Sequence, residues 1–341
     1  MKPGRFNELT KAYANLRVAV VGDFCLDRYL EIDPARSEVS IETGLEVYNV
    51  VNVRSQPGGS GTILNNLEAL GCGHLFPVGF AGEDGEGYEL TRSLAQAQGV
   101  DLRHFFQTSD RRTFTYCKPL VLAAKGASPR ELNRLDSKNL TPTPVSVQER
   151  LAKSISELAG EVDAMVLLEQ VDMADTGVLA GQVFIALRQA QKDYPKLLIL
   201  ADSRRGFAHF PNMALKMNRD EFTAMTGVST DQSVDALGQA IEQLANDRGH
   251  AVFVSLSEEG ILGALPGIAA EHVAGLPCRG EIDIVGAGDA VMANLALALA
   301  SGATAVEAMR LAMAAASAVI HQLGTTGVAS IEDLAPLVVD A

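Results

Sequence analysis

The chain has 341 residues, of which 47% are hydrophobic and 21% are charged, and it carries a formal net charge of −14. This balance is typical of a globular protein with enough apolar material for a core, in one large domain or two. The acidic surplus argues against nucleic acid or an anionic membrane surface as the main partner, because both attract basic patches.

Short β-branched runs alternate with helical patterns along most of the chain. The runs that look like buried parallel strands are residues 17–21, 164–168, 197–201 and 251–256. The helical patterns are residues 62–70, 87–98, 147–158, 176–192, 220–225, 233–248 and 290–300. Strands that alternate with helices predict an α/β fold with a doubly wound, mostly parallel sheet that is covered on both faces.

Two segments depart from this rhythm. Residues 39–53 and 112–122 alternate polar and apolar side chains, which is typical of half-exposed strands. We expect both to form a small β-sheet that projects from the main body. Because such a sheet has an apolar face without a partner, it should cover a pocket, pair with another subunit, or both. Two peripheral hairpins are the alternative.

The cysteines and histidines do not suggest a disulfide framework or a transition-metal site. The four cysteines contain no CxxC pair, so reduced thiols are expected. None of the six histidines has an HExxH or related ligand spacing. Residues 1–16 are polar and charged, the apolar run after them is too short for a signal sequence, and polar residues interrupt the Ala-rich stretch after Asp289. We therefore expect a cytoplasmic protein.

The most informative motif is the sequence DIVGAGDA at residues 283–290, which leads directly into a helical pattern. A glycine-rich turn that opens a helix directs unpaired backbone N–H groups and the positive end of the helix dipole at one point, which suits a phosphate. Asp289 stands beside that point, where a carboxylate can take a proton from a hydroxyl that attacks the phosphate. The motif therefore predicts phosphoryl transfer to an alcohol.

Two N-terminal motifs suit the binding of a polyol. Asp23 and Asp27 follow the end of the first strand, where side chains of an open α/β sheet face the ligand crevice. The glycines at 58, 59 and 61 permit close approach of the backbone to a ligand immediately before a helix. In the alternative interpretation Asp23 caps a turn, Asp27 pairs with an arginine, and the glycines form an ordinary turn.

Two later motifs suit nucleotide phosphates. Asn218 and Glu221 share a face of a first helical turn and either hold Mg²⁺ through its waters or form a capping box. Ser255, Ser257 and Gly260 follow a buried strand and either touch phosphates or form a hairpin turn.

Together and in this order, the Gly58-Gly59 pair, the NxxE pair at 218–221 and the DIVGAGDA run resemble the ribokinase-like PfkB family of carbohydrate kinases. The resemblance covers essentially the whole chain, and residues 21–29, 56–59 and 134–136 are most similar to bacterial heptose-phosphate kinases. It implies a single kinase domain over residues 1–341, built as a three-layer α/β/α sandwich with a β-lid from roughly residues 33–55 and 111–123. It also implies a homodimer that pairs through this lid.

The same resemblance implies an ATP-dependent transfer of the γ-phosphate to a hydroxyl of a sugar or sugar phosphate. Asp289 would be the general base, and the turn that forms the anion hole would comprise Gly286, Ala287, Gly288 and Asp289 itself. Substrate contacts would come from Asp23, Asp27, Gly58, Gly59 and Asn66. Contacts with ATP would come from Asn218, Glu221, Ser255, Ser257, Gly260, Ala314 and Ser317. Glu221 would hold Mg²⁺ through water, and Asp283 stands where some relatives hold a monovalent cation, which leaves dependence on K⁺ open.

The chain departs from the family pattern where the acceptor would bind. Thr62 takes the place of an asparagine, residues 168–172 lack an expected aromatic residue and lysine, and residues 202–206 read DSRRG where a DPKG-like sequence is typical. Phosphotransfer is therefore expected without a defined acceptor. One hypothesis is that Arg204 or Arg205 neutralises an anionic group, and the alternative is a solvated basic turn.

Two other classes of protein remain open at this point. One is a catalytically silent relative that binds a sugar or nucleotide, and the other is a kinase for a nucleoside or another non-sugar alcohol. A nucleotide-dependent oxidoreductase is disfavoured, because the first strand is followed by Gly-Asp-Phe rather than by a GxGxxG loop.

Overall fold

A nine-stranded sheet forms the centre of the protein, in a computed structural model that describes residues 1–123, 129–229 and 233–339. In spatial order its strands are β15 (Glu271–Val273), β14 (Ile261–Ala264), β13 (Val252–Ser255), β12 (Ala214–Asn218), β11 (Leu198–Ser203), β10 (Ala164–Glu169), β1 (Arg17–Gly22), β6 (His74–Gly82) and β7 (Phe105–Thr108). Neighbouring strands are parallel from β7 to β13, and only the pairs that involve β14 are antiparallel. The expected mostly parallel α/β sheet is therefore confirmed.

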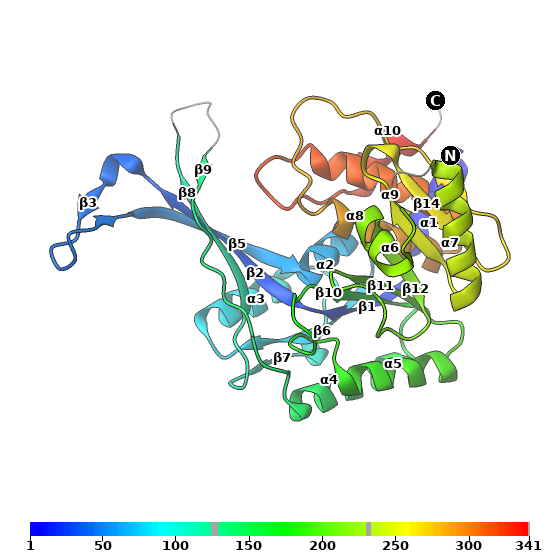
Figure 1. Cartoon of the computed structure of the whole chain (residues 1–341), viewed down its shortest axis with the longest axis horizontal. Coiled ribbons are helices and arrows are strands. Elements are labelled where there is room, and N and C mark those ends of the chain that lie inside the picture. Colours follow the sequence, from blue (N-terminus) through cyan, green and yellow to red (C-terminus); the bar gives the residue numbers. More distant parts are fainter. Residues whose placement is uncertain (124–128, 230–232, 340–341) are drawn as a thin grey trace.

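Helices cover both faces of this sheet and complete three layers (Figure 1). One face carries α1 (Pro3–Tyr13), α2 (Ser60–Ala69), α3 (Gly85–Gln96), α8 (Ala287–Ala300), α9 (Ala305–Ile320) and α10 (Ile331–Val338). The other carries α4 (Val145–Leu158), α5 (Gly181–Asp193), α6 (Arg219–Thr226) and α7 (Val234–Arg248). Because successive side chains of a strand point to opposite faces, Val18 and Val20 pack in the first core and Ala19 and Val21 in the second.

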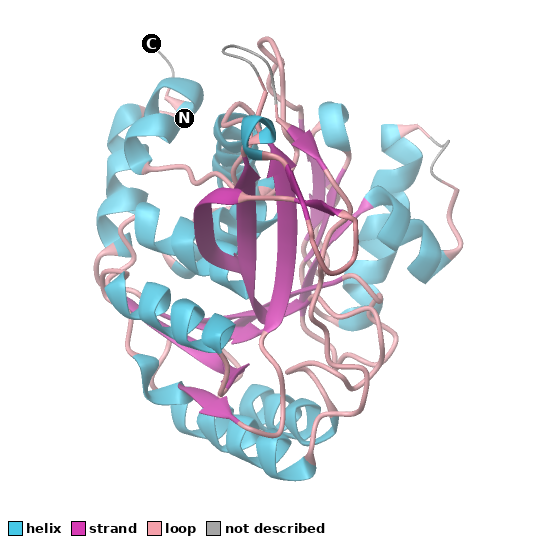
Figure 2. Cartoon of the chain, turned by 90° about the vertical axis from the view of Figure 1, so that its left-hand side faces the viewer, coloured by secondary structure: helices cyan, strands magenta, loops and turns pink. Residues whose placement is uncertain are grey.

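A second, four-stranded sheet projects from this body and forms the lid (Figures 1 and 2). Its order is β5 (Val50–Gly59), β2 (Phe24–Ile32), β8 (Phe114–Val121) and β9 (Arg130–Glu131), and a two-stranded ribbon of β3 (Glu38–Val39) and β4 (Glu46–Val47) continues its far end. Three short 3-10 turns, η1 (Pro34–Arg36), η2 (Leu102–His104) and η3 (Ser257–Glu259), complete the regular structure of the described residues.

The lid is larger than its expected bounds of 33–55 and 111–123. Strand β2 begins at Phe24, because the chain leaves the central sheet at Gly22 and enters the lid after one residue. Residues 39–53 are not one strand but the β3–β4 ribbon and the start of β5. Strand β2 was missed because its burial does not alternate with a period of two.

The apolar runs correctly predict β1, β10, β11 and β13, whereas β6, β7, β12, β14 and β15 were not predicted. The helix expected at 176–192 begins only at Gly181, and the preceding residues form an irregular loop after β10. In the part of the chain that the structure describes, no helix combines the length and the apolar composition needed for a membrane crossing.

Candidate active site

A cavity of about 660 Å³ lies at the carboxyl ends of the central strands, where the lid meets the body. The chain order of the strands reverses at β1, because β6 lies on one side of it and β10 on the other. Ligands of open α/β sheets bind at such a switch point. The residues that line the cavity come from the lid, from the first turn of α2, from β10 and β11 and the loops after them, from β12 and α6, from the turn that opens α8 and from the segment before α10.

The DIVGAGDA run forms the turn that opens α8, as its sequence predicts. Gly286 is the N-cap residue with a φ of 86°, and a Cβ there would also meet the Thr326 methyl group at 2.7 Å, so glycine is required twice. The N–H groups of Gly288 and Asp289 have no recorded hydrogen-bond partner within the described residues. The N–H of Ala287, by contrast, donates to the Ile284 carbonyl. The N–H group of Ala287 is therefore already engaged, and in this conformation it does not contribute to the expected anion hole.

Asp289 lies in the first turn of α8, lines the cavity and is half-buried. Burial raises the pKa of its carboxyl group to about 7. The nearby Lys216 ammonium opposes this shift, and the Asp202 carboxylate adds to it. A carboxylate whose pKa lies near neutral pH is well matched to accept a proton at that pH.

A buried ion pair lies beneath the start of α8. Lys216 on β12 donates from Nζ to Oδ2 of Asp202 on β11 across 2.6 Å, and both residues line the cavity. A Cβ on Gly288 would lie 3.2 Å from the same Nζ atom. Lys216 is not among the site residues expected from the sequence. Its position near the end of a strand, two residues before Asn218, would have indicated that it lies at the same edge of the sheet.

Asp27 also lines the cavity, from the lid strand β2. Burial raises the pKa of its carboxyl group, and Lys118 and Arg134 partly oppose that shift. Gly58 on the neighbouring strand makes room for this carboxylate, since a Cβ there would come within 2.5 Å of Asp27 Oδ2. Gly59 lines the cavity with a φ of 57°, in the left-handed region that favours glycine.

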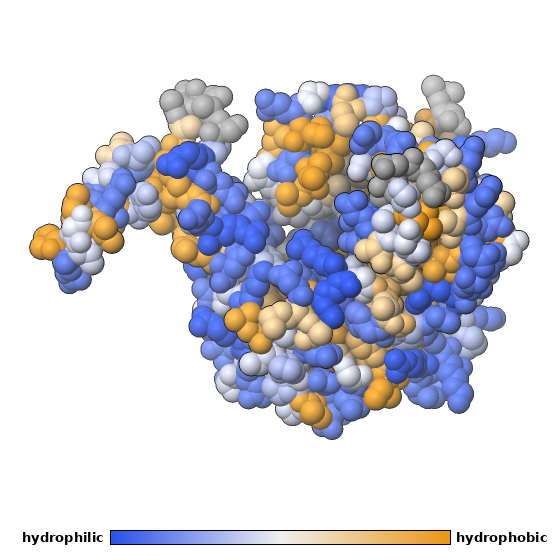
Figure 3. Space-filling view, viewed as in Figure 1, coloured by the Kyte–Doolittle hydropathy of each residue, from blue (hydrophilic) through white to orange (hydrophobic). Residues whose placement is uncertain are grey.

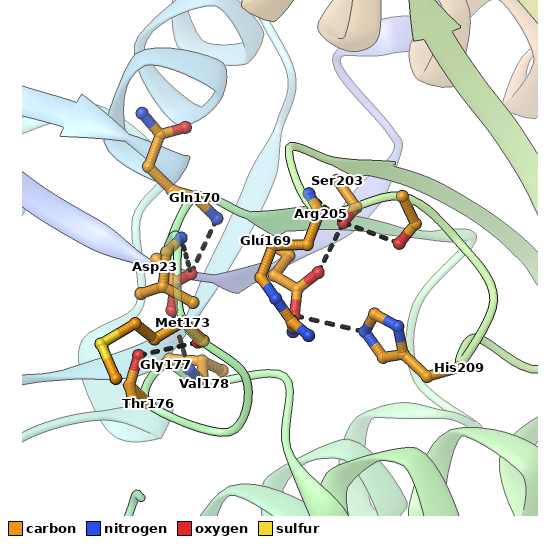
Figure 4. Close-up of polar contacts among 12 residues, drawn as sticks. Asp23, Glu169, Gln170, Met173, Thr176, Gly177, Val178, Ser203, Arg205 and His209 are labelled. Carbon is orange, nitrogen blue, oxygen red and sulfur yellow. Dashed lines mark hydrogen bonds and ion pairs between the residues drawn. The ribbon is translucent and has the colours of Figure 1, made fainter. Parts of the chain in front are cut away.

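Asp23 does not face the cavity, which corrects the expectation that it binds substrate. Its side chain is buried, and its two carboxylate oxygens accept hydrogen bonds from the N–H groups of Gln170, Val171 and Val178 (Figure 4). Both aspartates were expected in the ligand crevice because they follow the end of the first strand, but the chain turns from one sheet into the other at Asp23.

Two further expected ligand contacts are corrected because both residues are fully buried. Asn66 lies inside α2, donates to the Thr62 carbonyl and accepts from the N–H of Ala329, so it joins this helix to the segment before α10. Ala314 lies on the face of α9 that packs in the hydrophobic core, so its side chain presents no surface to a nucleotide.

Asn218 and Glu221 form the capping box that was the alternative interpretation. The Asn218 side chain accepts from the N–H of Glu221, and Glu221 Oε2 accepts from the N–H of Asn218. Glu221 nevertheless lines the cavity, and burial raises the pKa of its carboxyl group, with a further contribution from Asp202. The capping hydrogen bond therefore occupies one carboxylate oxygen of Glu221, and the carboxylate still lies close to that of Asp202.

The other expected nucleotide contacts lie outside the cavity. Ser255 and Ser257 flank the turn between β13 and β14, and Gly260 closes that turn with a φ of 100°. Ser317 is half-buried on α9, and its carbonyl accepts from His321. The carboxylate of Asp283, expected near a monovalent cation, accepts from the N–H groups of Val285 and Gly324. The expected roles of these three nucleotide contacts, of Ser317 and of Asp283 therefore stay predictions.

The two arginines after β11 have different environments. Arg205 donates from Nη1 to Oε1 of the buried Glu169 at 2.7 Å, and Glu169 also accepts from Ser203 at 2.5 Å and contacts His209 (Figure 4). Arg204 is exposed and lines the cavity, with no ion pair recorded within the described residues. The structure thus separates a pocket arginine from a structural one, which the sequence did not.

The lid adds further positive charge to the cavity in a protein whose net charge is −14. Lys118 lies on β8 without a recorded ion pair in the described chain, and its Nζ is 5.1 Å from the centre of the Tyr29 ring. Arg134 and Lys138 follow β9, and both lie over the ring of Tyr116, at 5.4 and 5.8 Å. With Arg204, these cations face the same space as Asp27.

A family model described as pfkB family carbohydrate kinase matches residues 16–332. The bifunctional protein HldE of Bradyrhizobium sp. (strain ORS 278) is 29% identical over 330 residues, which cover 96% of this chain and 64% of that protein. HldE of Shewanella baltica (strain OS155 / ATCC BAA-1091) is 32% identical over 323 residues, which cover 94% and 63%. The chain therefore spans slightly less than two thirds of the length of these relatives.

Solved structures share the fold. Arabidopsis thaliana ribokinase complexed with ribose and ATP aligns with a TM-score of 0.66 and 20% identity, covering 96% of this chain and 99% of that one. Phosphofructokinase-2 from Escherichia coli in complex with fructose-6-phosphate aligns with a TM-score of 0.69 and 20% identity, covering 94% and 98%.

Proposed function

The chain belongs to the pfkB family of carbohydrate kinases. We propose that it transfers the γ-phosphate of ATP to a sugar hydroxyl, and we assign this reaction to residues of the cavity described above. One observation carries the assignment. Asp289, the Lys216 ammonium and the N–H groups of Gly288 and Asp289, which have no hydrogen-bond partner within the described residues, lie together at a cavity that Asp27 also lines from the lid strand β2.

In this mechanism Asp289 accepts the proton of the attacking hydroxyl. Asp27 accepts hydrogen bonds from neighbouring hydroxyls and so orients the acceptor. The N–H groups of Gly288 and Asp289, with the Lys216 ammonium, stabilise the negative charge of the phosphoryl group in transit. Positioning and charge stabilisation supply most of the catalysis in phosphoryl transfer, and these groups provide both.

Magnesium is the cofactor that we propose beside the phosphates. The residues fit it chemically, since Mg²⁺ prefers carboxylate oxygens and water, and Glu221 and Asp202 bring two carboxylates to the same wall of the cavity. Bound there, the ion would neutralise phosphate charge. Potassium beside Asp283 is a further expectation from the resemblance, and replacing K⁺ with a larger monovalent cation in the assay tests it.

A sugar phosphate is the acceptor class that the pocket supports best. A neutral sugar needs hydrogen-bond partners for its hydroxyls, such as Asp27, but it has no negative charge to pair with the cations of the pocket. Among these cations, Lys118 and Arg204 form no ion pair within the described residues. Guanidinium and ammonium groups suit phosphate oxygens. The complex of E. coli phosphofructokinase-2 with fructose-6-phosphate shows that a sugar phosphate binds to that protein of the same fold.

We also propose that two copies of the chain pair through the lid. Its outer strands and ribbon expose hydrophobic side chains, which Figure 3 shows on the projecting part of the molecule. They are Val39, Ile41, Leu45, Tyr48, Val50, Val51 and Val53, all at least 42% exposed. Exposed apolar strands of this kind are expected to have a partner.

The test is ADP release with ATP and Mg²⁺ across a panel of sugars, sugar phosphates and nucleosides. Turnover that is fastest with a sugar phosphate supports the proposal. Turnover confined to nucleosides or other alcohols assigns the acceptor elsewhere. Measurable sugar and ATP binding without turnover of any compound would identify a silent relative and overturn the proposal.

A further inference from the structure

Asp23 is almost completely buried, at 1% exposure, in the single-residue connection between the central sheet and the lid. Its N–H donates to the Leu168 carbonyl, and its own carbonyl accepts from the N–H of Ser60. Its carboxylate accepts at 2.8 and 3.2 Å from Gln170 and Val171, and at 2.7 Å from Val178. One residue thus holds the end of β10, the start of α2 and both ends of the loop after β10.

Each of these segments carries a wall of the acceptor side of the cavity. Asp27 follows Asp23 on β2, and Thr62 lies in the first turn of α2. Gln170 and Asp172 lie on the loop after β10, which has no helix or strand of its own before α5. An irregular loop keeps one conformation only where its backbone groups are fixed, and three of its N–H groups are fixed by Asp23.

The same loop is tied to the lid. Arg111, which precedes β8, donates to the Thr176 carbonyl at 2.8 Å, and Thr143, which follows the lid, donates from its hydroxyl to the Gly177 carbonyl at 2.7 Å. Lys138 pairs with Asp172 at 2.7 Å. The position of the loop therefore sets both the wall that it forms itself and the base of the lid above it.

Gly177 gives independent evidence that this carboxylate is accommodated by the loop. A Cβ on Gly177 would lie 2.3 Å from Asp23 Oδ1 and 2.8 Å from Oδ2. Gly177 does not have a positive φ, so its backbone does not itself require glycine. A glycine at position 177 therefore leaves the space that the Asp23 carboxylate occupies against the loop.

We propose that Asp23 is a positioning residue that assembles the acceptor half of the site through the loop at 170–178. This inference rests on the proposed kinase site, because the walls that Asp23 holds matter only if an acceptor binds between them. The nucleotide side, built from β12 and the start of α8, has no recorded contact with the Asp23 side chain within the described residues. Loss of Asp23 should therefore affect the acceptor and spare ATP.

The experiment compares Asp23→Asn with wild type, using as acceptor the panel compound that wild type turns over fastest. An asparagine offers one acceptor oxygen and an NH₂ group that faces amide donors, so the loop loses its anchor. We expect the KM for the acceptor to rise by about tenfold or more, and the KM for ATP to stay within about twofold. Hydrogen exchange of the full chain should become faster across residues 168–180.

Two matched variants separate positioning from lost stability. Gly177→Ala leaves Asp23 intact but displaces it, so it should raise the acceptor KM in the same way, whereas Gly85→Ala, which meets no atom within 4 Å, should not. Glu307→Ala removes an ion pair with Arg5 and the capping-box partner of Thr304 on α9, so it should lower the melting temperature without changing either KM.

Equal rises in both KM values, or an unchanged acceptor KM in Asp23→Asn and Gly177→Ala, would overturn this inference while leaving the kinase assignment intact. If wild type turned over no acceptor, the proposed function would fail instead. Asp23 would then be judged from hydrogen exchange alone, and unchanged exchange at 168–180 would reject its anchoring role.

Discussion

Lys216 Nζ donates to Asp202 Oδ2 across 2.6 Å, and the pair lies directly under the first turn of α8. Both side chains are largely removed from water, at 6% and 12% exposure. They act on Asp289 with opposite signs, because the ammonium lowers the pKa of its carboxyl group and the Asp202 carboxylate raises it. Lys216 therefore brings positive charge to the phosphate site that we propose, and the two charges together set the pKa of Asp289, the base that we propose.

Asp289→Asn should abolish most of the turnover. An amide cannot take the proton of the acceptor hydroxyl, and a positioned general base contributes roughly 10² to 10⁴ in rate. We expect kcat to fall by about that factor and the dissociation constant of ATP to stay unchanged, measured by ADP release and by calorimetry. Retained turnover would remove Asp289 as the base.

The pH dependence of kcat/KM for the acceptor should report the pKa of Asp289 in the free protein, which is about 7. Only the ionised carboxylate accepts a proton, so kcat/KM should reach a plateau above neutral pH and fall by about tenfold per pH unit well below it. Lys216→Met should move the midpoint to higher pH, and Asp202→Asn should move it to lower pH. Shifts of the same sign in both folded variants would contradict this arrangement of charges.

Arg204→Ala and Arg205→Ala should differ in kind. Arg204 lines the cavity, so its loss should raise the KM for a phosphorylated acceptor by roughly tenfold and leave the KM for its unphosphorylated analogue unchanged. Arg205 instead pairs with the buried Glu169, so its loss should lower the melting temperature. Arg188→Ala on the exposed face of α5 is the control for charge alone. A larger acceptor effect at Arg205 than at Arg204 would reverse the assignment.

The sequence predicts the parts of this protein that depend on local pattern. Apolar runs identify the inner strands, and the DIVGAGDA run identifies the helix start that carries Asp289. The pairing of Lys216 with Asp202 depends on β12 lying beside β11, which no local pattern gives. Asp23 and Asp27 were treated alike because nothing in their spacing reveals the turn from one sheet into the other. The helical pattern extends back to residue 176, because Val178 and Leu179 fit a helical period. In the structure these two side chains reach the core from an irregular loop instead.

Gly58→Ala should weaken acceptor binding through Asp27. The added methyl carbon would meet three atoms of the Asp27 carboxyl group at 2.5 to 2.8 Å, so the carboxylate has to move. We expect the acceptor KM to rise by roughly tenfold, which corresponds to about 1.4 kcal/mol, with little change in the KM for ATP. Gly85→Ala again serves as the control, since its methyl group meets open space. An unchanged acceptor KM would show that the carboxylate does not contact the acceptor.

Charge placed on the lid should separate the proposed dimer. Ile41 in the ribbon and Val53 on β5 are 102% and 44% exposed, and in a paired lid both would be buried against the second copy. Ile41→Glu with Val53→Glu would place two charges from each copy in that interface, where burying an unpaired charge is costly. We expect sedimentation analysis to give a dimer for wild type and a monomer for this variant.

The control for this prediction is Ile185→Glu on α5, at a position that is 54% exposed, close to the 44% of Val53, but on the body rather than the lid. It adds charge at another exposed isoleucine and should leave the dimer intact. If Ile185→Glu dissociated the protein while the lid variant did not, the interface would lie on the body. A wild-type protein that stayed monomeric at all concentrations tested would instead leave the apolar lid without a second copy, and its exposed strands would then need a different partner.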